Sequence, residues 1–276
     1  MTADALYLIK DLVELAGGEK PVVEAWFVSH TDSDHAGPLL RFADFVDQKD
    51  YADKIIVEGV YCNIPYYDAN NSTYQTILAQ IQHFLIGVAK CKTSTGATPK
   101  VYRPQIGQKY YFDDITVDVM YTHEQLDASI WSADANEAST WLRFTIDGKT
   151  FLHSGDALDE SIDGIIGVYD TNFLDFDVVT TPHHAQHATE NFVNQIVKED
   201  SKILYTTYIN DTQTIRYCKT ENIALRNKVG AGNYICWGAG TVVITFDGDE
   251  VVMKTNDKGN RTWDWHPNRE TPTQYL

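Results

Sequence analysis

The sequence has 276 residues, of which 43% are hydrophobic and 12% aromatic, so a packed α/β domain is expected and a disordered chain is not. Its formal net charge of −17 argues against an extended groove for duplex nucleic acid and against binding to an anionic membrane surface. A small or short anionic substrate is still allowed, because divalent cations reverse the sign of the field locally.

The four cysteines are scattered and form no Cys-x-x-Cys pair: Cys62, Cys91, Cys218 and Cys236. We interpret them as core thiols of a protein in a reducing compartment. No window reaches the roughly 20 apolar residues that span a bilayer, and no basic and then apolar leader opens the sequence. We therefore expect a cytoplasmic protein without a membrane segment, unless the natural protein extends further upstream.

The first hundred residues predict helices that alternate with strands. Apolar residues at helical spacing over 5–16 predict a helix, which Gly17 and Gly18 end. Buried strands are expected over 22–29 and 54–61. Further helices are expected from Gly37 onward and over 72–92, the latter with Ser72 as its N-cap.

From residue 101 on, short strands separated by turn residues dominate, and the pair Asp147-Gly148 is typical of a β-hairpin turn. The expected strands cover 101–102, 109–112, 115–121, 140–146, 149–153, 176–181, 203–208, 234–237, 241–246 and 250–254, and the expected helices cover 189–198 and 221–228.

Strands and helices interleave in both halves, which predicts the α/β class with two sheets sandwiched between helices. We expect one domain over residues 1–276. Its last part, from about residue 256 to 276, is an aromatic tail with Trp263 and Trp265 that serves either as a contact element or as a cap of the sandwich.

The first candidate site is a run of ligand-type side chains after the strand over 22–29: His30, Asp32, Asp34 and His35. Imidazoles and carboxylates so crowded repel or desolvate one another unless a cation organises them. Residues two apart on a strand point the same way, so His30 and Asp32 can share one metal, and the following turn can aim Asp34 and His35 at a second. The alternative is a strand-end loop with an Asp cap and a solvated histidine.

Two further strands end in side chains of the same types. Residues 149–153 run into Gly155-Asp156, and residues 176–181 run into Pro182-His183-His184. The carboxyl ends of strands are the edge at which α/β sheets gather their sites, so we expect the three clusters to serve one function.

The order His-x-Asp-x-Asp-His, then strand-Ser-Gly-Asp, then Pro-His-His resembles the metallo-β-lactamase superfamily from about residue 20 to about residue 255. It is closest to the branch that contains the soluble hydrolase domain of ComEC-type DNA-uptake proteins. That branch has Asp at the second motif position and Asn-x-x-Ser where others have a metal-binding histidine, as in the segment from Asn136 to Ser139. The resemblance implies a four-layer αββα sandwich and a hydrolase with two divalent metal ions.

The resemblance also implies ligand roles. His30 and Asp32 would bind the first metal, and Asp34 and His35 the second. Asp156 would bridge the two metals.

The histidine of the last motif would join the second metal, and we favour His184 over His183, which would then serve around the site or contact substrate. Asp34 would also position the attacking water. His183, His187 or His153 would protonate the leaving group.

The sequence departs from the family pattern at several points. Ala185 stands where a glycine is usual, and the first metal lacks its third histidine, for which Asn136, Ser139 or His153 are the candidates. The family's first hairpin is not visible upstream of His30, so either that hairpin is missing or the natural protein extends further.

Asp32 in place of a histidine makes the first site harder and richer in oxygen. That favours manganese or magnesium over zinc and leaves the first site weak or empty in the absence of substrate oxygens. Zinc at both positions is the second choice.

We therefore predict a metal-dependent hydrolase that acts on a phosphodiester. The aromatic pair Tyr66 and Tyr67 would either stack on the substrate or pack in the core. An acyl or ester hydrolase of lactonase or thioesterase type on the same fold, and a degenerate member that binds without catalysis, are the alternatives. Substrate, metal identity and oligomeric state are left open.

Overall fold

The computed structural model describes residues 2–32, 34–37, 39–40, 53–206, 219–236, 242–247 and 250–255. The chain forms two compact units. The first unit comprises Met1–Ile106 and Thr122–Thr140, and the second comprises Gly107–Tyr121 and Trp141–Leu276. The single domain over residues 1–276 stays a prediction, and the aromatic tail over 256–276 lies outside the described residues.

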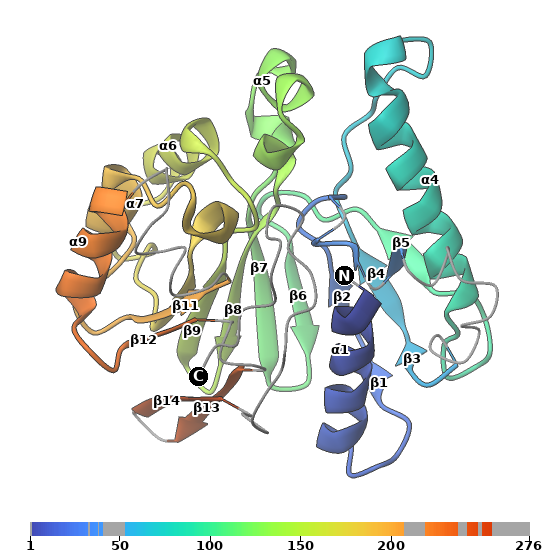
Figure 1. The fold of residues 1–276 in the computed structure, drawn as a ribbon, viewed down its shortest axis with the longest axis horizontal. Coiled ribbons are helices and arrows are strands. Elements are labelled where there is room, and N and C mark those ends of the chain that lie inside the picture. Colours follow the sequence, from blue (N-terminus) through green and yellow to red (C-terminus); the bar gives the residue numbers. More distant parts are fainter. Residues whose placement is uncertain are drawn as a thin grey trace, which may run out of the picture. The chain divides into compact units, whose positions relative to one another are not determined.

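The first unit combines short parallel strands with two long helices (Figure 1). Its elements are α1 (Thr2–Leu15), β1 (Val22–Val23), β2 (Trp26–Phe27), β3 (Ile56–Val57), β4 (Gly59–Tyr61), the 3-10 turn Ser72–Tyr74, α4 (Gln75–Lys90), β5 (Lys100–Tyr102), the 3-10 turn His123–Gln125, α5 (Ala128–Ala133) and the 3-10 turn Ala135–Ala138.

Two of the strands predicted in this unit are each interrupted once. The strand expected over 22–29 forms β1 and β2, and the strand expected over 54–61 forms β3 and β4. The parallel register is the same on both sides of the break, with Val22 opposite Ile56 and Trp26 opposite Val60. The ladder is interrupted at Glu24, where the chain bends, so both predicted strands are present in part, each as two short segments.

The helix predicted over 72–92 is confirmed as a 3-10 turn that continues into α4, but its cap is one residue earlier than expected. Asn71, not Ser72, accepts the backbone N–H of Thr73 at 3.0 Å. Asn and Ser are equally good caps, so composition alone does not separate adjacent candidates. Of the helix expected from Gly37, the described residues Gly37, Leu39 and Leu40 are helical.

The core of the first unit lies between its strands and its helices. Val28, Val57 and Val60 from the strand region pack with Phe84 and Val88 of α4, and all five are almost fully buried. Two free thiols, Cys62 and Cys91, lie in the same core, and burial raises the pKa of each to about 12. Core thiols are thus confirmed for these two cysteines.

The second unit is built on a mixed seven-stranded sheet with the order β12-β11-β10-β9-β8-β7-β6. The strands are β6 (Lys109–Phe112), β7 (Ile115–Tyr121), β8 (Trp141–Ile146), β9 (Lys149–His153), β10 (Val178–Thr180), β11 (Lys202–Tyr205) and β12 (Tyr234–Cys236). From β6 to β9 the neighbours are antiparallel, and from β9 to β12 they are parallel. A separate antiparallel hairpin consists of β13 (Val242–Asp247) and β14 (Glu250–Thr255).

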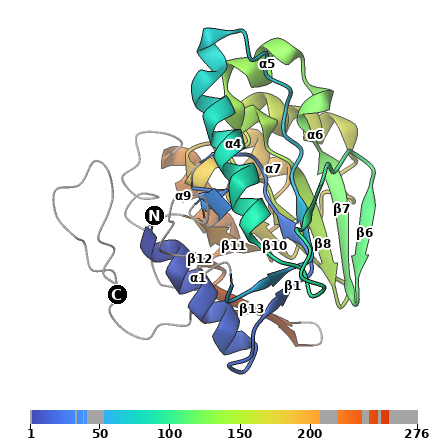
Figure 2. The same ribbon diagram turned by 90° about the vertical axis from the view of Figure 1, so that its right-hand side faces the viewer.

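Three helices follow the parallel strands: α6 (Asp159–Val168), α7 (Glu190–Gln195) and α9 (Lys219–Val229). α6 contacts α7, and α7 contacts α9, so the three lie in a row, as Figures 1 and 2 show. The sequence did not predict α6, because Gly164 and Gly167 interrupt its apolar pattern. It also did not predict the short α5.

The α/β class is confirmed by this alternation of strands and helices. The hairpin turn at Asp147-Gly148 is confirmed as well, since both residues have the positive φ of a tight β-turn (50° and 74°) between β8 and β9. The four-layer sandwich stays a prediction. Within the described residues, no helix has the length and apolar character needed to cross a bilayer.

Gly87 allows α4 to approach the segment that follows the His30–His35 cluster. A Cβ at Gly87 would overlap the carbonyl oxygen of Leu39, which is backbone and cannot swing away. We expect Gly87→Ala to lower the free energy of unfolding by about 2–3 kcal/mol, measured by urea denaturation.

The matched control is Gly167→Ala in α6, where a Cβ would meet nothing within 4 Å. This control should be neutral or stabilising by about 0.5–1 kcal/mol, because alanine is the better helix former. Equal effects of the two substitutions would contradict the close approach at Gly87.

Candidate metal centre

The first cluster lies in a tight turn directly after β2. The backbone ladder ends where Val28 N donates to Tyr61 O, and then His35 N and Ala36 N both donate to the carbonyl oxygen of Asp32 at 3.0 and 2.9 Å. This turn fixes where the four ligand-type side chains emerge. The hydrogen bond from Thr140 N to Ser29 O, at 3.0 Å, holds the start of the turn.

Both imidazoles of the first cluster have the same orientation. Ser29 Oγ lies 3.1 Å from His30 Nδ1 and 3.2 Å from His35 Nδ1, and Ser139 Oγ lies 3.3 Å from His30 Nδ1. The opposite nitrogens face carboxylates, with His30 Nε2 3.7 Å from Asp32 Oδ2 and His35 Nε2 3.9 Å from Asp34 Oδ2. The four predicted residues of this cluster are therefore brought together.

His30 provides a test of whether a metal fits this cluster. Its side chain is buried, and within the described part of the chain its Nε2 has no hydrogen-bond partner. A buried ring nitrogen is seldom left unsatisfied, and here it faces a carboxylate beyond hydrogen-bond distance. A divalent cation accepts imidazole nitrogen and carboxylate oxygen together, so the donor set fits one.

The second cluster is formed by the loops after β9 and β10, which are parallel neighbours. The two loops are joined where His183 N donates to Gly155 O at 3.1 Å and Ser154 N donates to Thr180 Oγ1 at 3.1 Å. Since both strands end at the same edge, Asp156 is brought opposite the Pro182-His183-His184 segment, as the sequence predicts.

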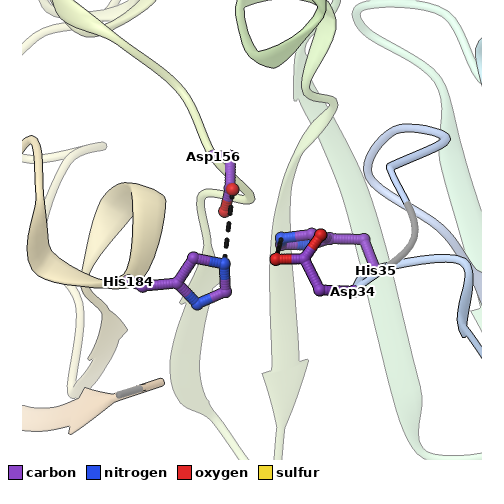
Figure 3. Close-up of side chains that lie close together, drawn as sticks. All are labelled: Asp34, His35, Asp156 and His184. Carbon is purple, nitrogen blue, oxygen red and sulfur yellow. Dashed lines mark ion pairs between the residues drawn. The ribbon is translucent and has the colours of Figure 1, made fainter. Parts of the chain in front are cut away.

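Asp156 and His184 form the closest pair of this cluster. His184 Nε2 lies 3.3 Å from Asp156 Oδ2, and His184 Nδ1 lies 3.1 Å from the carbonyl oxygen of Thr206. The Asp156 side chain is only 4% exposed, so its charge needs a compensating cation. Figure 3 shows Asp156 facing His184, and, in the first cluster, Asp34 beside His35, with a dashed line for each ion pair.

The two adjacent histidines, His183 and His184, differ in their contacts. His183 Nε2 lies further from Asp156 Oδ2, at 3.8 Å, and its ring stacks on His187 at 5.1 Å between centroids. His187 in turn contacts Asp159, with Nδ1 3.3 Å from Oδ1. The geometry therefore favours His184 as the ligand and leaves His183 beside it.

A run of three residues in the left-handed region shapes this segment. His183, His184 and Ala185 have φ angles of 46°, 52° and 69°. This conformation costs a residue with a Cβ about 1–2 kcal/mol and is free for glycine, which explains why glycine is the usual residue where Ala185 stands. Alanine in place of glycine at position 185 thus adds backbone strain, but the residue still adopts the left-handed conformation.

The three residues proposed in place of a third histidine ligand lie in different surroundings. Ser139 contacts His30 Nδ1, the nitrogen opposite the one that faces Asp32. Asn136 is half-buried in the 3-10 turn Ala135–Ala138. His153 is the last residue of β9, in the second unit.

No protein-family model and no curated protein matches the sequence. Several solved structures are similar to the chain, and two of them serve as examples. One is the metallo-β-lactamase fold protein YhfI from Bacillus subtilis, with 16% identity, coverage of 77% of this chain and 74% of that chain, and a TM-score of 0.39. The other is a possible metal-dependent hydrolase from Veillonella parvula, with 14% identity, coverage of 82% and 76%, and a TM-score of 0.40.

Sequence reasoning missed the groups that orient the imidazoles. Ser29 precedes the motif and carries no signal of its own, and the Thr206 group is a backbone carbonyl that any residue would supply. The parallel pairing of β10 with β11 is the one feature that places Thr206 near the Pro-His-His segment, and that pairing is not readable from residue types.

The two adjacent tyrosines have different environments. Tyr67 is buried, and burial, followed by the charge of Asp32, raises its pKa to about 12, so the Tyr67 hydroxyl keeps its proton at neutral pH. Tyr66 is 81% exposed. Tyr67 therefore packs in the core, whereas the Tyr66 side chain is accessible to solvent and ligands.

A second polar cluster in the first unit is structural. His123 is buried, burial lowers its pKa, and its Nε2 lies 3.4 Å from Arg103 Nη2. Arg103 also donates to Asn63 Oδ1 at 2.7 Å and contacts Glu124 at 3.2 Å. These contacts hold the segment around His123 against the fold.

The strain at Ala185 can be measured. Ala185→Gly removes the left-handed penalty but also one buried methyl group, worth about 0.8 kcal/mol, and adds chain entropy to the unfolded state. We expect these effects to cancel, with a change in the free energy of unfolding within about 0.5 kcal/mol.

Ala188→Gly is the comparison, since Ala188 is equally buried but has no positive φ. It should cost about 1–2 kcal/mol, because nothing offsets the lost methyl group and the added entropy. The same loss at both positions in urea denaturation would show that Ala185 is not strained.

Proposed function

We propose that this chain is a metal-dependent hydrolase that acts on a phosphodiester. One observation carries the proposal. In each of three imidazoles, His30, His35 and His184, Nδ1 lies at a hydroxyl or carbonyl oxygen and Nε2 faces a carboxylate. Metal-binding histidines are held in this way, with one nitrogen fixed from behind and the other turned toward the metal and its acidic ligands.

The His184 pair supports a cation most directly. A backbone carbonyl only accepts hydrogen bonds, so the contact with Thr206 O places the proton of His184 on Nδ1. In the neutral ring, the Nε2 lone pair then faces the Asp156 carboxylate at 3.3 Å, and two acceptors repel at that distance. A second proton or a metal ion between them would remove this repulsion, and a metal ion would satisfy both groups.

The proposed ligands of the better site are Asp34 and His35 from the first cluster with Asp156 and His184 from the second, as the order of the motifs in the sequence implies. His30 and Asp32 hold a second, weaker site. A divalent cation supplies a Lewis acid that lowers the pKa of water and neutralises charge on phosphoryl oxygens.

Two residues act in the proposed reaction beside their structural contacts. Asp34 has the more exposed carboxylate of its cluster, 53% against 35% for Asp32, so it can accept a hydrogen bond from an attacking water and orient it. His183 holds a proton at Nε2 for the leaving oxygen. Its stacking on His187 fixes the ring, and its partial exposure lets it exchange protons with solvent.

The substrate class follows from charge and from exposed aromatic surface. The net charge of −17 disfavours a long nucleic-acid contact, whereas metal ions attract a short phosphodiester locally. Tyr66 offers an exposed ring on which a base or another planar group can stack. A small phosphodiester or a short single-stranded end fits these features, and the motif resemblance to the DNA-uptake branch points the same way.

The reaction can be tested with bis-p-nitrophenyl phosphate. Manganese should stimulate its hydrolysis, and Asp156→Asn should lower kcat/KM at least about a hundredfold, because the buried carboxylate is then lost as a ligand. Asp34→Ala should have a similar effect.

Asp163→Asn is the matched control, since Asp163 is an exposed carboxylate of α6 that contacts Asn191, and it should keep wild-type activity. No turnover with any divalent metal would contradict the phosphodiesterase. Turnover of p-nitrophenyl acetate alone would favour the acyl hydrolase, and an inactive protein that still binds metal would favour the non-catalytic binder.

Asp32 sets the metal preference of the weaker site. We expect wild-type protein dialysed against metal-free buffer to keep less than two equivalents of zinc, and Asp32→His to gain zinc at this site, because imidazole is the better zinc ligand. Inductively coupled plasma mass spectrometry measures both. Two tightly held zincs in the wild type would contradict the role of Asp32.

A further inference from the structure

Helix α9 has a polar residue on its buried face. Asn222, Leu225 and Val229 are the residues that it buries, at the spacing of one helix face, and Asn222 is fully buried. A buried side-chain amide is costly unless it is hydrogen-bonded, and the neighbouring positions on this face are apolar. Asn222 is therefore expected to make a hydrogen bond that an apolar residue at this position could not make.

The hydrogen bond of Asn222 joins helix α9 to the segment that carries His183 and His184. Its Nδ2 donates to the carbonyl oxygen of Ala185 at 2.8 Å, across 37 residues of sequence and in a buried setting. Ala185 is the last residue of the left-handed run His183–Ala185. The amide thus holds the carbonyl at the end of the turn from which both histidines emerge.

This turn must be stabilised by contacts with other segments, because its three residues have positive φ angles and none of them is glycine. Left-handed backbone is unfavourable for all three, and in the absence of a restraint the segment would relax and redirect the imidazoles. His184 is held from one side by the Thr206 carbonyl, which fixes its ring but not the backbone after it. The backbone before the run is held by the hydrogen bond from His183 N to Gly155 O, and Asn222 supplies a restraint at its other end.

We propose that Asn222 is a positioning residue, which keeps His184 in its metal-binding orientation by holding the strained Ala185 backbone. It touches neither metal nor substrate. The proposal rests on the proposed function for the role of His184 as ligand, while the restraint itself is a property of the fold. Helix α9 is anchored independently, since Lys228 Nζ donates to Val193 O at 2.8 Å.

The test measures manganese and zinc dissociation constants by titration calorimetry, with each metal alone as the probe. Asn222→Ala should weaken binding about tenfold, as removal of orienting groups around metal ligands does. Asn222→Leu, which keeps the volume, should weaken it similarly. Asn191→Ala, which removes an exposed amide bonded to Asp163, should change the constants less than twofold.

Rescue separates positioning from general loss of structure. In an Ala185→Gly background residue 185, whose carbonyl Asn222 holds, is no longer strained, although His183 and His184 still have positive φ angles. Asn222→Ala should therefore weaken metal binding less than threefold and shift the urea midpoint less than in the wild-type background. Additive effects of the two substitutions in both measurements would overturn the proposal. If the wild type binds neither metal, the proposed function fails, and the urea midpoints alone decide whether Asn222 restrains the turn.

Discussion

The buried carboxylate of Asp156 is the constraint on which the candidate site depends. Its side chain is 4% exposed and faces His184 Nε2 at 3.3 Å, while the Thr206 carbonyl holds the other nitrogen of that ring. A charge withdrawn from water must be compensated nearby, and the proposed metal ion would supply that compensation. The same logic applies to His30, whose buried Nε2 faces Asp32.

The rest of the fold supplies the geometry that this pairing needs. Parallel strands β9, β10 and β11 end at one edge, so Asp156, His184 and Thr206 emerge together from segments far apart in sequence. In the first cluster, backbone hydrogen bonds to the Asp32 carbonyl close the turn, and the Ser29 hydroxyl contacts the imidazoles of both His30 and His35. In both clusters the imidazoles are oriented by common groups, namely a serine hydroxyl in the first and a backbone carbonyl in the second.

The sequence predicted the ligand-type residues well because their chemistry is local. Polar residues at the ends of apolar strands indicated His30, Asp32, Asp34, His35, Asp156 and the pair His183-His184, and the α/β class followed from the alternation of patterns. The interrupted strands were not predictable, since the break at Glu24 leaves the apolar pattern intact. Helix α6 was hidden by its two glycines. Thr206 and Asn222 act through long-range contacts that residue type does not reveal.

Anomalous diffraction from crystals grown with zinc tests the central claim most directly. A peak at the zinc edge within about 2.0–2.2 Å of both His184 Nε2 and an Asp156 oxygen is the predicted result. An ordered Asp156–His184 pair without a peak, with the two groups in direct hydrogen-bond contact, would show that a proton provides the compensating charge. That result would contradict a metal centre at this pair.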